Sequence, residues 1–256
     1  SAFRDKLAQS EKKVSSFFLG MILNNCPLPY PNHGHVVVAK PSPCLLYPIS
    51  SSETRILIDF PQAEAPRKSP ELTDYLMNTI LPQLPLQVRH SFTEAVEEGK
   101  FKVMPNHYIP AKPVFKAGTV LLGDSLNMRH PLTGGGMTVA FTDIKLLGSL
   151  WTKTDHRPQT TEHGQLQNTI DDIVKEFYKT RHKQDATINI LADALYGVMR
   201  NEDLKIACYD YLKRGGVYAE EPVSLLSAVS RDQNLLLRHF FAVAFYGVKN
   251  VIKVPT

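Results

Sequence analysis

One stretch of this chain, Thr119–Phe141, constrains its fold more than any other, and it reads TVLLGDSLNMRHPLTGGGMTVAF. The apolar run Thr119–Leu122 predicts a short buried strand, which Gly123-Asp124 ends. A loop closed by Pro131 follows, and then three consecutive glycines. Beyond the glycines, apolar residues recur at the spacing of a helix, at Val139, Ile144, Leu147 and Trp151. The stretch therefore predicts a strand, an acidic turn, a Gly-rich loop and a helix in direct succession.

This succession is typical of a site for a phosphorylated ligand. The glycines, Gly134–Gly136, let the backbone approach a ligand closely, because glycine has no Cβ. The N–H groups at the start of the following helix favour negative charge. Asp124 would add a carboxylate that accepts hydrogen bonds from sugar hydroxyls. Together these features predict a cofactor that carries both phosphate and a polyol.

The composition is that of an ordinary folded protein and argues against several classes of site. The chain has 256 residues, of which 43% are hydrophobic and 21% charged. A net charge of +4 does not by itself predict a nucleic-acid partner. The three cysteines show no CxxC spacing, which argues against a zinc site or a disulfide framework and fits a reducing compartment. The nine histidines contain no HExxH pair, so no metal site is predicted.

The first half of the chain predicts a small sheet with helices. Four runs rich in Val, Ile, Leu and aromatic residues predict strands at Phe17–Leu23, His35–Ala39, Cys44–Ile49 and Arg55–Phe60. Their close spacing favours an antiparallel meander. Helices are expected over residues 1–16, 72–81 and 86–98, and an extended connector over 104–113.

The second half of the chain predicts helices. Residues 166–200 have helical spacing and form one long helix or two, and residues 204–212 form another. The segments 223–229 and 235–248 are dense in Leu, Phe, Ala and Val, and basic residues interrupt or border them. A run of about 14 mostly apolar residues is short for a membrane span. A helix lying in the membrane interface and a buried core helix fit the pattern equally well.

Two enzyme classes are disfavoured by the motifs around the glycines. Gly123-Asp124-Ser125-Leu126 spells the GDSL motif of a class of serine esterases, but no Asp in the chain has a His three residues later to complete a triad. A nucleotide-binding Walker loop ends in Gly-Lys-Ser/Thr, whereas Gly136 is followed by Met137-Thr138.

The pattern strand, GD, HP, GGGM and helix resembles the second flavin-contacting motif of group A flavoprotein monooxygenases. More narrowly, NMRHPLTGGGMTVAF (127–141) closely resembles the squalene monooxygenase (squalene epoxidase) family. Three further stretches resemble the same family in the same order along nearly the whole chain: 42–59 (SPCLLYPISSSETRILID), 104–111 (MPNHYIPA) and 235–248 (LLLRHFFAVAFYGV). The resemblance implies FAD as cofactor. It also implies an α+β fold, with an antiparallel substrate-domain sheet, part of a flavin monooxygenase FAD domain and a helical C-terminal region.

The resemblance also implies roles for individual residues. Asp124 and Met137 match FAD-contacting positions, and the loop around them consists of Gly123, Pro131, Gly134, Gly135 and Gly136. Tyr47 matches a tyrosine at the active-site end of the substrate pocket, while Pro131 and Leu132 would lie where substrate meets flavin, so these three are the expected catalytic residues. His239, Phe240 and Phe241, with Tyr47, would line or cap an apolar substrate tunnel.

The activity implied by the resemblance is an FAD-dependent monooxygenation in sterol biosynthesis. Squalene would be converted to (S)-2,3-epoxysqualene with O₂, and NADPH–cytochrome P450 reductase would deliver the electrons. The resemblance implies membrane lipid as a partner and a monotopic location on the cytosolic face of the endoplasmic reticulum, in the microsomal fraction.

The resemblance further implies a division into three parts. Residues 1–113 would form the substrate-binding sheet and helices, 114–165 the C-terminal part of the FAD-binding domain, and 166–256 a helical region with membrane-associating helices. The Rossmann GxGxxG motif with which the family begins is not found among the fourteen glycines, so the chain resembles the family's C-terminal half. A non-catalytic, membrane-associated lipid-binding module is therefore the alternative to an epoxidase.

Overall fold

The computed structural model describes residues 6–7, 10–62, 64–153 and 163–252 of the chain. The chain divides into two compact units. The sheet unit consists of Val14–His107 and Val198–Lys205, and the helical unit of Ser1–Lys13, Tyr108–Gly197 and Ile206–Thr256. The division into three parts inferred from the family resemblance stays a prediction.

The sheet unit is built on five strands in the order β2-β3-β4-β1-β5. Their bounds are β1 (Lys13–Asn24), β2 (His35–Val37), β3 (Cys44–Pro48), β4 (Glu53–Phe60) and β5 (Phe101–Tyr108). The pairs β2–β3, β3–β4 and β1–β4 are antiparallel, which confirms the predicted antiparallel sheet and its α+β class. The registers Leu46↔Ile56 and Leu19↔Ile58 bring buried apolar side chains together on neighbouring strands.

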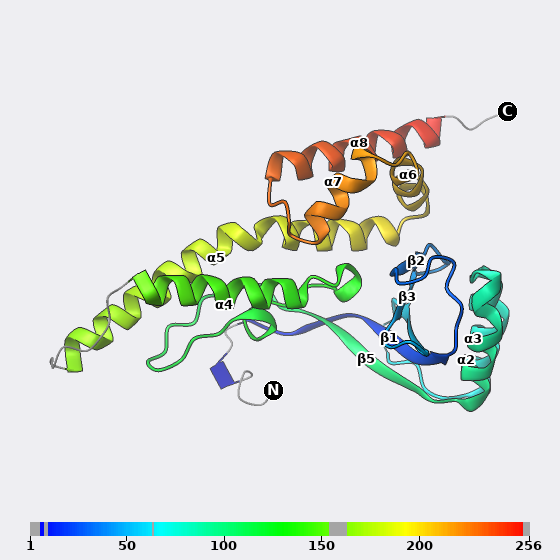
Figure 1. The fold of residues 1–256 in the computed structure, drawn as a ribbon, viewed down its shortest axis with the longest axis horizontal. Helices are drawn as coiled ribbons and strands as arrows, with labels where there is room; N and C mark the ends of the chain where they lie inside the picture. The colour runs from blue at the N-terminus through cyan, green and yellow to red at the C-terminus, as the bar shows by residue number, and fades with distance from the viewer. Residues whose placement is uncertain (1–5, 8–9, 63, 154–162, 253–256) are drawn as a thin grey trace. The chain divides into compact units, whose positions relative to one another are not determined.

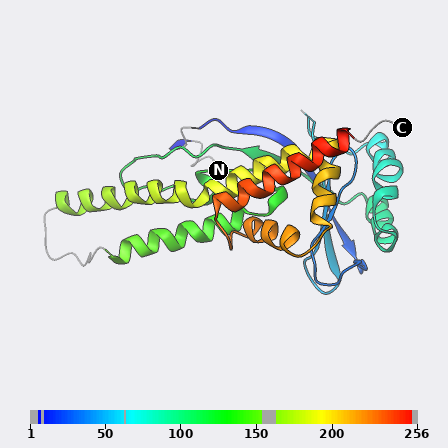
Figure 2. The same ribbon diagram turned by 90° about the horizontal axis from the view of Figure 1, so that it is seen from above.

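A short helical layer packs against this sheet (Figures 1 and 2). It consists of α2 (Pro70–Tyr75), a π-helical turn η1 (Leu76–Ile80), a 3₁₀ turn η2 (Leu81–Gln83) and α3 (Leu86–Glu98). Helix α3 buries a stripe at helical spacing, Val88, Phe92, Ala95 and Val96, in one core with the apolar side chains of the strands. Pro85 before the helix and Gly99 after it, with φ of +61°, explain why its bounds match the prediction.

Two predictions in this half of the chain were wrong, and a third, the helix over 72–81, was right about helical structure but not about its type. Strand β1 begins at Lys13, so residues 13–16 are not helical, and residues 1–5 and 8–9 lie outside the described residues. The helix expected over 72–81 changes to π and 3₁₀ geometry after Tyr75, approaching Pro82, which has no N–H to donate. The connector's first half, residues 104–108, belongs to β5, which is an edge strand of the sheet, the position at which a sheet tolerates a proline such as Pro105.

The helical unit contains α4 (Gly136–Lys153), most of α5 (His163–Met199) and α6 (Glu202–Leu212), and α7 (Val217–Leu226) and α8 (Gln233–Ile252). The predicted segment 166–200 is thus one long helix, ending at Met199, rather than two. Helices α4 and α5 run alongside each other in both views (Figures 1 and 2). A second apolar core forms here and includes Leu121, Leu126, Leu146 and Phe177.

The strand predicted at Thr119–Leu122 does not form. The segment has extended backbone at Leu122, but its ladder contact is confined to the bridge between Lys116 and Thr119. The N–H of Leu121 instead donates to the Tyr178 hydroxyl of α5, at 3.1 Å. A strand forms hydrogen bonds to a neighbouring strand, whereas here a side-chain hydroxyl accepts the hydrogen bond of the backbone N–H.

Candidate functional site

The GD turn follows this extended segment as a single 3₁₀ turn, η3 (Gly123–Ser125). Gly123 is buried with φ of +53°, a conformation that residues with a Cβ rarely adopt. A Cβ at this position would lie 3.1 Å from the Cβ of Ala140 in α4. Glycine is therefore required both by the backbone conformation and by the close approach of the helix. The neighbouring Asp124 is exposed to solvent.

The Gly-rich loop brings the start of α4 beside this aspartate. The loop passes through the 3₁₀ turn η4 (Pro131–Thr133) and then Gly134, which has φ of +65°. A Cβ built on Gly136 would lie 3.5 Å from both carboxylate oxygens of Asp124. A Cβ on Gly135 would lie 2.7 Å from Cδ1 of Ile188 in α5. The carboxylate and the first turn of the helix thus lie side by side, with no side chain between them.

These residues fit the cofactor that the sequence predicts. The first N–H groups of a helix have no intrahelical acceptor, and they carry partial positive charge. Met137 at this helix start is exposed, as is Asp124, whereas the N–H of Gly134 already donates to the carbonyl of Pro131 at 3.0 Å. An exposed carboxylate next to exposed N–H donors suits a polyol joined to a phosphate.

Arg129 connects the Gly-rich loop to α5 through hydrogen bonds of its buried side chain. Its side chain is buried, and Nε donates to Oδ1 of Asn189 at 2.8 Å. Nη2 donates to Oδ1 of Asn127 at 2.9 Å, and Nη1 donates to the carbonyl of Gly135 at 3.4 Å. Burial lowers the pKa of Arg129, and nearby carboxylates, including Asp124, partly offset this lowering. The arginine therefore stabilises the loop conformation and adds positive charge behind it.

His130 shapes the part of the loop that contains Pro131 and Leu132. It is buried, its Nδ1 accepts a hydrogen bond from the N–H of Leu132 at 3.2 Å, and its ring stacks on Tyr196 of α5. The two ring centroids are 3.7 Å apart. Leu132 is buried and Pro131 exposed. Their expected catalytic role stays a prediction.

A buried ionic network lies behind the GD turn. The N–H of Gly123 donates to Oδ2 of Asp143 at 2.6 Å, and Nε of Arg181 donates to the same oxygen at 2.9 Å. The guanidinium also forms an ion pair with Asp185 at 3.1 Å, and these three charged side chains are almost fully buried. Burial raises the pKa of Asp185 to about 6, an effect that Arg181 partly opposes.

Sequence analysis missed this network, although a signal was present. Asp143 lies four residues after Val139 and three before Leu146, so it falls on the same buried face of α4 as these two apolar residues. A carboxylate on a buried face needs a cationic partner, which indicates a structural or functional role.

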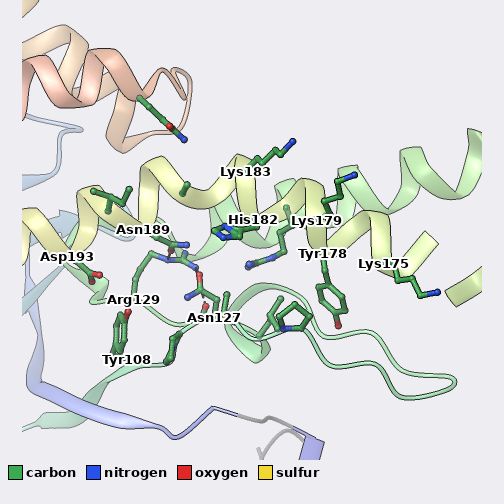
Figure 3. Close-up of a pocket in the computed structure, with 18 of the residues that line it drawn as sticks. Tyr108, Asn127, Arg129, Lys175, Tyr178, Lys179, His182, Lys183, Asn189 and Asp193 are labelled. Atoms are coloured by element: carbon green, nitrogen blue, oxygen red, sulfur yellow. Dashed lines mark hydrogen bonds between the residues drawn. The ribbon is translucent and has the colours of Figure 1, made fainter. Parts of the chain in front are cut away.

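A groove of about 890 Å³ opens between α5 on one side and, on the other, the end of β5 at Tyr108 and the loop that contains Asn127 (Figure 3). Its α5 wall carries Lys175, Lys179 and Lys183, which follow one another at four-residue spacing and so lie on one side of the helix. With Arg129 and Arg181, these make five cationic side chains against one carboxylate, Asp193, in the lining. Burial raises the pKa of Asp193. The lining thus carries more cationic than anionic side chains, although Lys175, Lys179 and Arg181 pair with carboxylates outside it. It includes none of the four predicted substrate-lining residues.

Those four residues lie in different parts of the chain. Tyr47 is half-buried on β3 of the sheet unit, where it pairs with Arg55. His239, Phe240 and Phe241 lie on α8 of the helical unit. Phe240 and Phe241 are 47% and 65% exposed and pack edge to face. Their assignment to an apolar substrate tunnel stays a prediction.

His239 is the buried member of the group and is held by two polar side chains. Its Nδ1 lies 2.7 Å from the Tyr211 hydroxyl of α6, and its Nε2 lies 2.9 Å from Oε2 of Glu221 in α7. Arg238 pairs with the same carboxylate. The histidine therefore links three helices, α6, α7 and α8.

Helix α8 presents large apolar side chains to solvent. They are Leu237, Phe240, Phe241, Phe245 and Val248, and each is about half or more exposed. Their helical spacing places them along one side of α8, and large exposed apolar patches are typical of interaction sites. None of the helices in the described ranges is sufficiently long and apolar to cross a bilayer. Nor do the described side chains include three or more His, Cys, Asp or Glu grouped as metal ligands.

A solved structure shares the fold. HpxO of Klebsiella pneumoniae, complexed with FAD and uric acid, aligns with a TM-score of 0.62 and 14% sequence identity. The alignment covers 95% of this chain and 57% of HpxO. At this identity the likeness concerns the fold alone.

Sequence comparison is more specific. Squalene epoxidase 3 of Arabidopsis thaliana is 43% identical over 98% of this chain, and squalene monooxygenase of Mus musculus is 40% identical over 96%. These matches cover 48% and 42% of the two relatives, so the chain spans about half the length of the curated relatives it matches. The family model for squalene epoxidase matches residues 1–256. With its whole length matched by that model, this chain belongs to the squalene epoxidase family.

Proposed function

We propose that this chain contributes the flavin loop and the substrate-binding sheet of an enzyme that epoxidises squalene. The observation that carries the proposal is the side-by-side placement of Asp124 and the exposed start of α4, joined by the Gly-rich loop. Family membership supports the substrate class and the reaction. The proposed product is (S)-2,3-epoxysqualene.

FAD is the proposed cofactor, and this chain would hold it by two kinds of contact. The carboxylate of Asp124 would accept hydrogen bonds from ribityl hydroxyls, while the N–H groups of Gly136 and Met137, at the start of α4, would donate to phosphate or to the ring system. When bound and reduced, FAD supplies the activated oxygen that reaches the alkene. The chain's own residues provide position and exclude water.

The substrate requires an apolar surface and no protein nucleophile. Leu132 is buried next to Pro131 at the head of α4, and we infer that this pair would contact the alkene end of squalene. Tyr47 would orient substrate, as the family resemblance suggests. The assignment leaves acid–base chemistry to the cofactor, because the transferred oxygen does not come from a side chain.

Membrane association through α8 is part of the proposal. Its exposed phenylalanines, bordered by Arg238 and Lys249, suit a helix lying in the headgroup region, at the cytosolic face of the endoplasmic reticulum. We expect the double variant Phe241→Glu/Phe245→Glu to bind vesicles of phosphatidylcholine and phosphatidylserine at least about tenfold more weakly in co-sedimentation. Leu86→Glu, at an exposed apolar residue of α3, is the matched control. Unchanged binding by the double variant would exclude α8 as the contact.

Electrons would come from NADPH through a flavoprotein reductase, so the test supplies both. The chain is incubated with FAD, NADPH, reductase, O₂ and detergent-dispersed squalene, and products are identified by mass spectrometry. The expected result is epoxysqualene formation that Asp124→Ala lowers strongly at limiting FAD and that Asp210→Ala, on the exposed side of α6, leaves unchanged. Vesicle and squalene binding without FAD binding or epoxide would favour the alternative, a non-catalytic lipid-binding module.

A further inference from the structure

The GD turn is held by a residue twenty positions later in the chain. Asp143 accepts the Gly123 N–H at 2.6 Å, which is short for an N–H···O bond, as expected for a charged acceptor. Gly123 immediately precedes Asp124, the proposed polyol acceptor. Because Asp143 fixes the Leu122–Gly123 peptide, one residue before Asp124, its position influences where that carboxylate points.

A second contact fixes Asp143 itself. Arg181 of α5 donates from Nε to the same Oδ2 atom, with side-chain exposures of 2% for Arg181 and 0% for Asp143. One buried oxygen thus accepts both from the turn and from a guanidinium. Removing one partner from a buried pair leaves an uncompensated charge, which is strongly unfavourable. The pair therefore allows Asp143 to stay a charged acceptor away from water.

The same helix carries both the cofactor loop and the acceptor. Helix α4 begins at Gly136 beside Asp124, passes Ala140 against Gly123, and presents Asp143 one turn later. The GD turn therefore contacts or approaches α4 at three successive positions, Gly136, Ala140 and Asp143. Helix α5, which runs alongside α4 (Figure 1), supplies Arg181.

We propose that Asp143, held by Arg181, is a positioning residue that aligns the GD turn with the start of α4 and so sets the geometry of the flavin site. The effect on FAD rests on the proposed function. The effect on the Gly123 amide does not.

The variant Asp143→Asn tests the proposal with little change in volume. An asparagine can offer its carbonyl oxygen to Gly123 and Arg181 only by placing its NH₂ where Oδ1 now lies, and Oδ1 has no hydrogen-bond partner among the described residues. In the reverse orientation the asparagine NH₂ would face two other donors, the N–H of Gly123 and Nε of Arg181. The matched control is Asp185→Asn, which also removes a buried carboxylate from Arg181 but does not touch Gly123.

Two measurements on the 256-residue chain separate the outcomes. In ¹⁵N-labelled protein, Asp143→Asn is expected to move the Gly123 amide proton upfield and to accelerate its exchange at least about tenfold, whereas Asp185→Asn leaves both unchanged. In an FAD titration, Asp143→Asn is expected to raise Kd at least about tenfold, with Asp185→Asn close to wild type. Thermal unfolding of both variants shows whether a shared loss of stability explains the change.

An unchanged Gly123 amide in a folded Asp143→Asn protein would overturn the positioning role, whatever happens to FAD. Equal changes of the Gly123 amide and of the FAD Kd in Asp143→Asn and Asp185→Asn would mean that the network only stabilises the fold, and would also overturn the positioning role. Absence of FAD binding in the wild type, with the amide effect intact, would reject the proposed flavin site while leaving the role of Asp143 in the turn.

Discussion

Substitution of Gly123 by alanine tests the local geometry of the site most closely. Placing a Cβ on a residue with φ of +53° costs about 1–2 kcal/mol in backbone strain. The new Cβ would also meet the Ala140 Cβ at 3.1 Å, and overpacking of this kind costs about 1–3 kcal/mol more because a helix must shift. Gly123→Ala should therefore lower the free energy of unfolding by about 2–5 kcal/mol.

Gly134→Ala provides the matched comparison. Gly134 has a similar φ of +65°, but nothing lies within 4 Å of a Cβ built there, so only the strain of about 1–2 kcal/mol applies. The assay is urea unfolding followed by fluorescence of Trp151, the single tryptophan, which lies on α4. Equal losses for the two variants would refute the argument from the Ala140 contact. A loss below about 0.5 kcal/mol for both would refute the left-handed conformation itself.

Two further predictions follow from the shifted pKa values. The pKa of Asp185 is raised from 3.8 to about 6 in the folded protein, so the folded state binds this proton more tightly than the unfolded chain. Its favourable contribution is complete below pH 3.8 and is lost as pH rises through 6. The difference in free energy of unfolding between Asp185→Asn and wild type should therefore move in favour of the variant, by up to about 3 kcal/mol, as pH rises from 4 to 7. Urea unfolding measures this difference, and a difference that is constant with pH would contradict the prediction. Burial, with a smaller effect of Asp59, raises the pKa of Cys44 to about 12, so iodoacetamide at pH 8 should label half-buried Cys26 well before Cys44; equal rates in the folded protein would show that Cys44 is accessible.

Local sequence predicted those elements whose ends and faces are encoded nearby. Helix α3 was predicted with its observed bounds because Pro85 and Gly99 flank it. The antiparallel sheet followed from short β-rich runs separated by turn residues. The Gly-rich loop and α4 were predicted because glycines and helical spacing are both local signals.

What depends on distant partners was not predictable from the same patterns. Thr119–Leu122 has the composition of a strand, but its Leu121 N–H donates to Tyr178, far along the chain. Strand β5 was missed because Pro105 argues against a strand unless the strand is known to lie at an edge. The pairing of Asp143 with Arg181 joins positions 38 residues apart, and no local spacing indicates which cation a buried carboxylate will contact.

The central claim is that Asp124 and the adjoining helix start form a flavin site, and an FAD titration tests it most directly. Quenching of flavin fluorescence is measured with the wild-type chain, Asp124→Ala and the control Asp210→Ala. The account predicts saturable binding by the wild type and the control, and a loss of about 1–3 kcal/mol in affinity for Asp124→Ala, the cost of leaving polar partners unpaired. Binding that is unaffected by Asp124→Ala, or no binding by any of the three proteins, would contradict the claim.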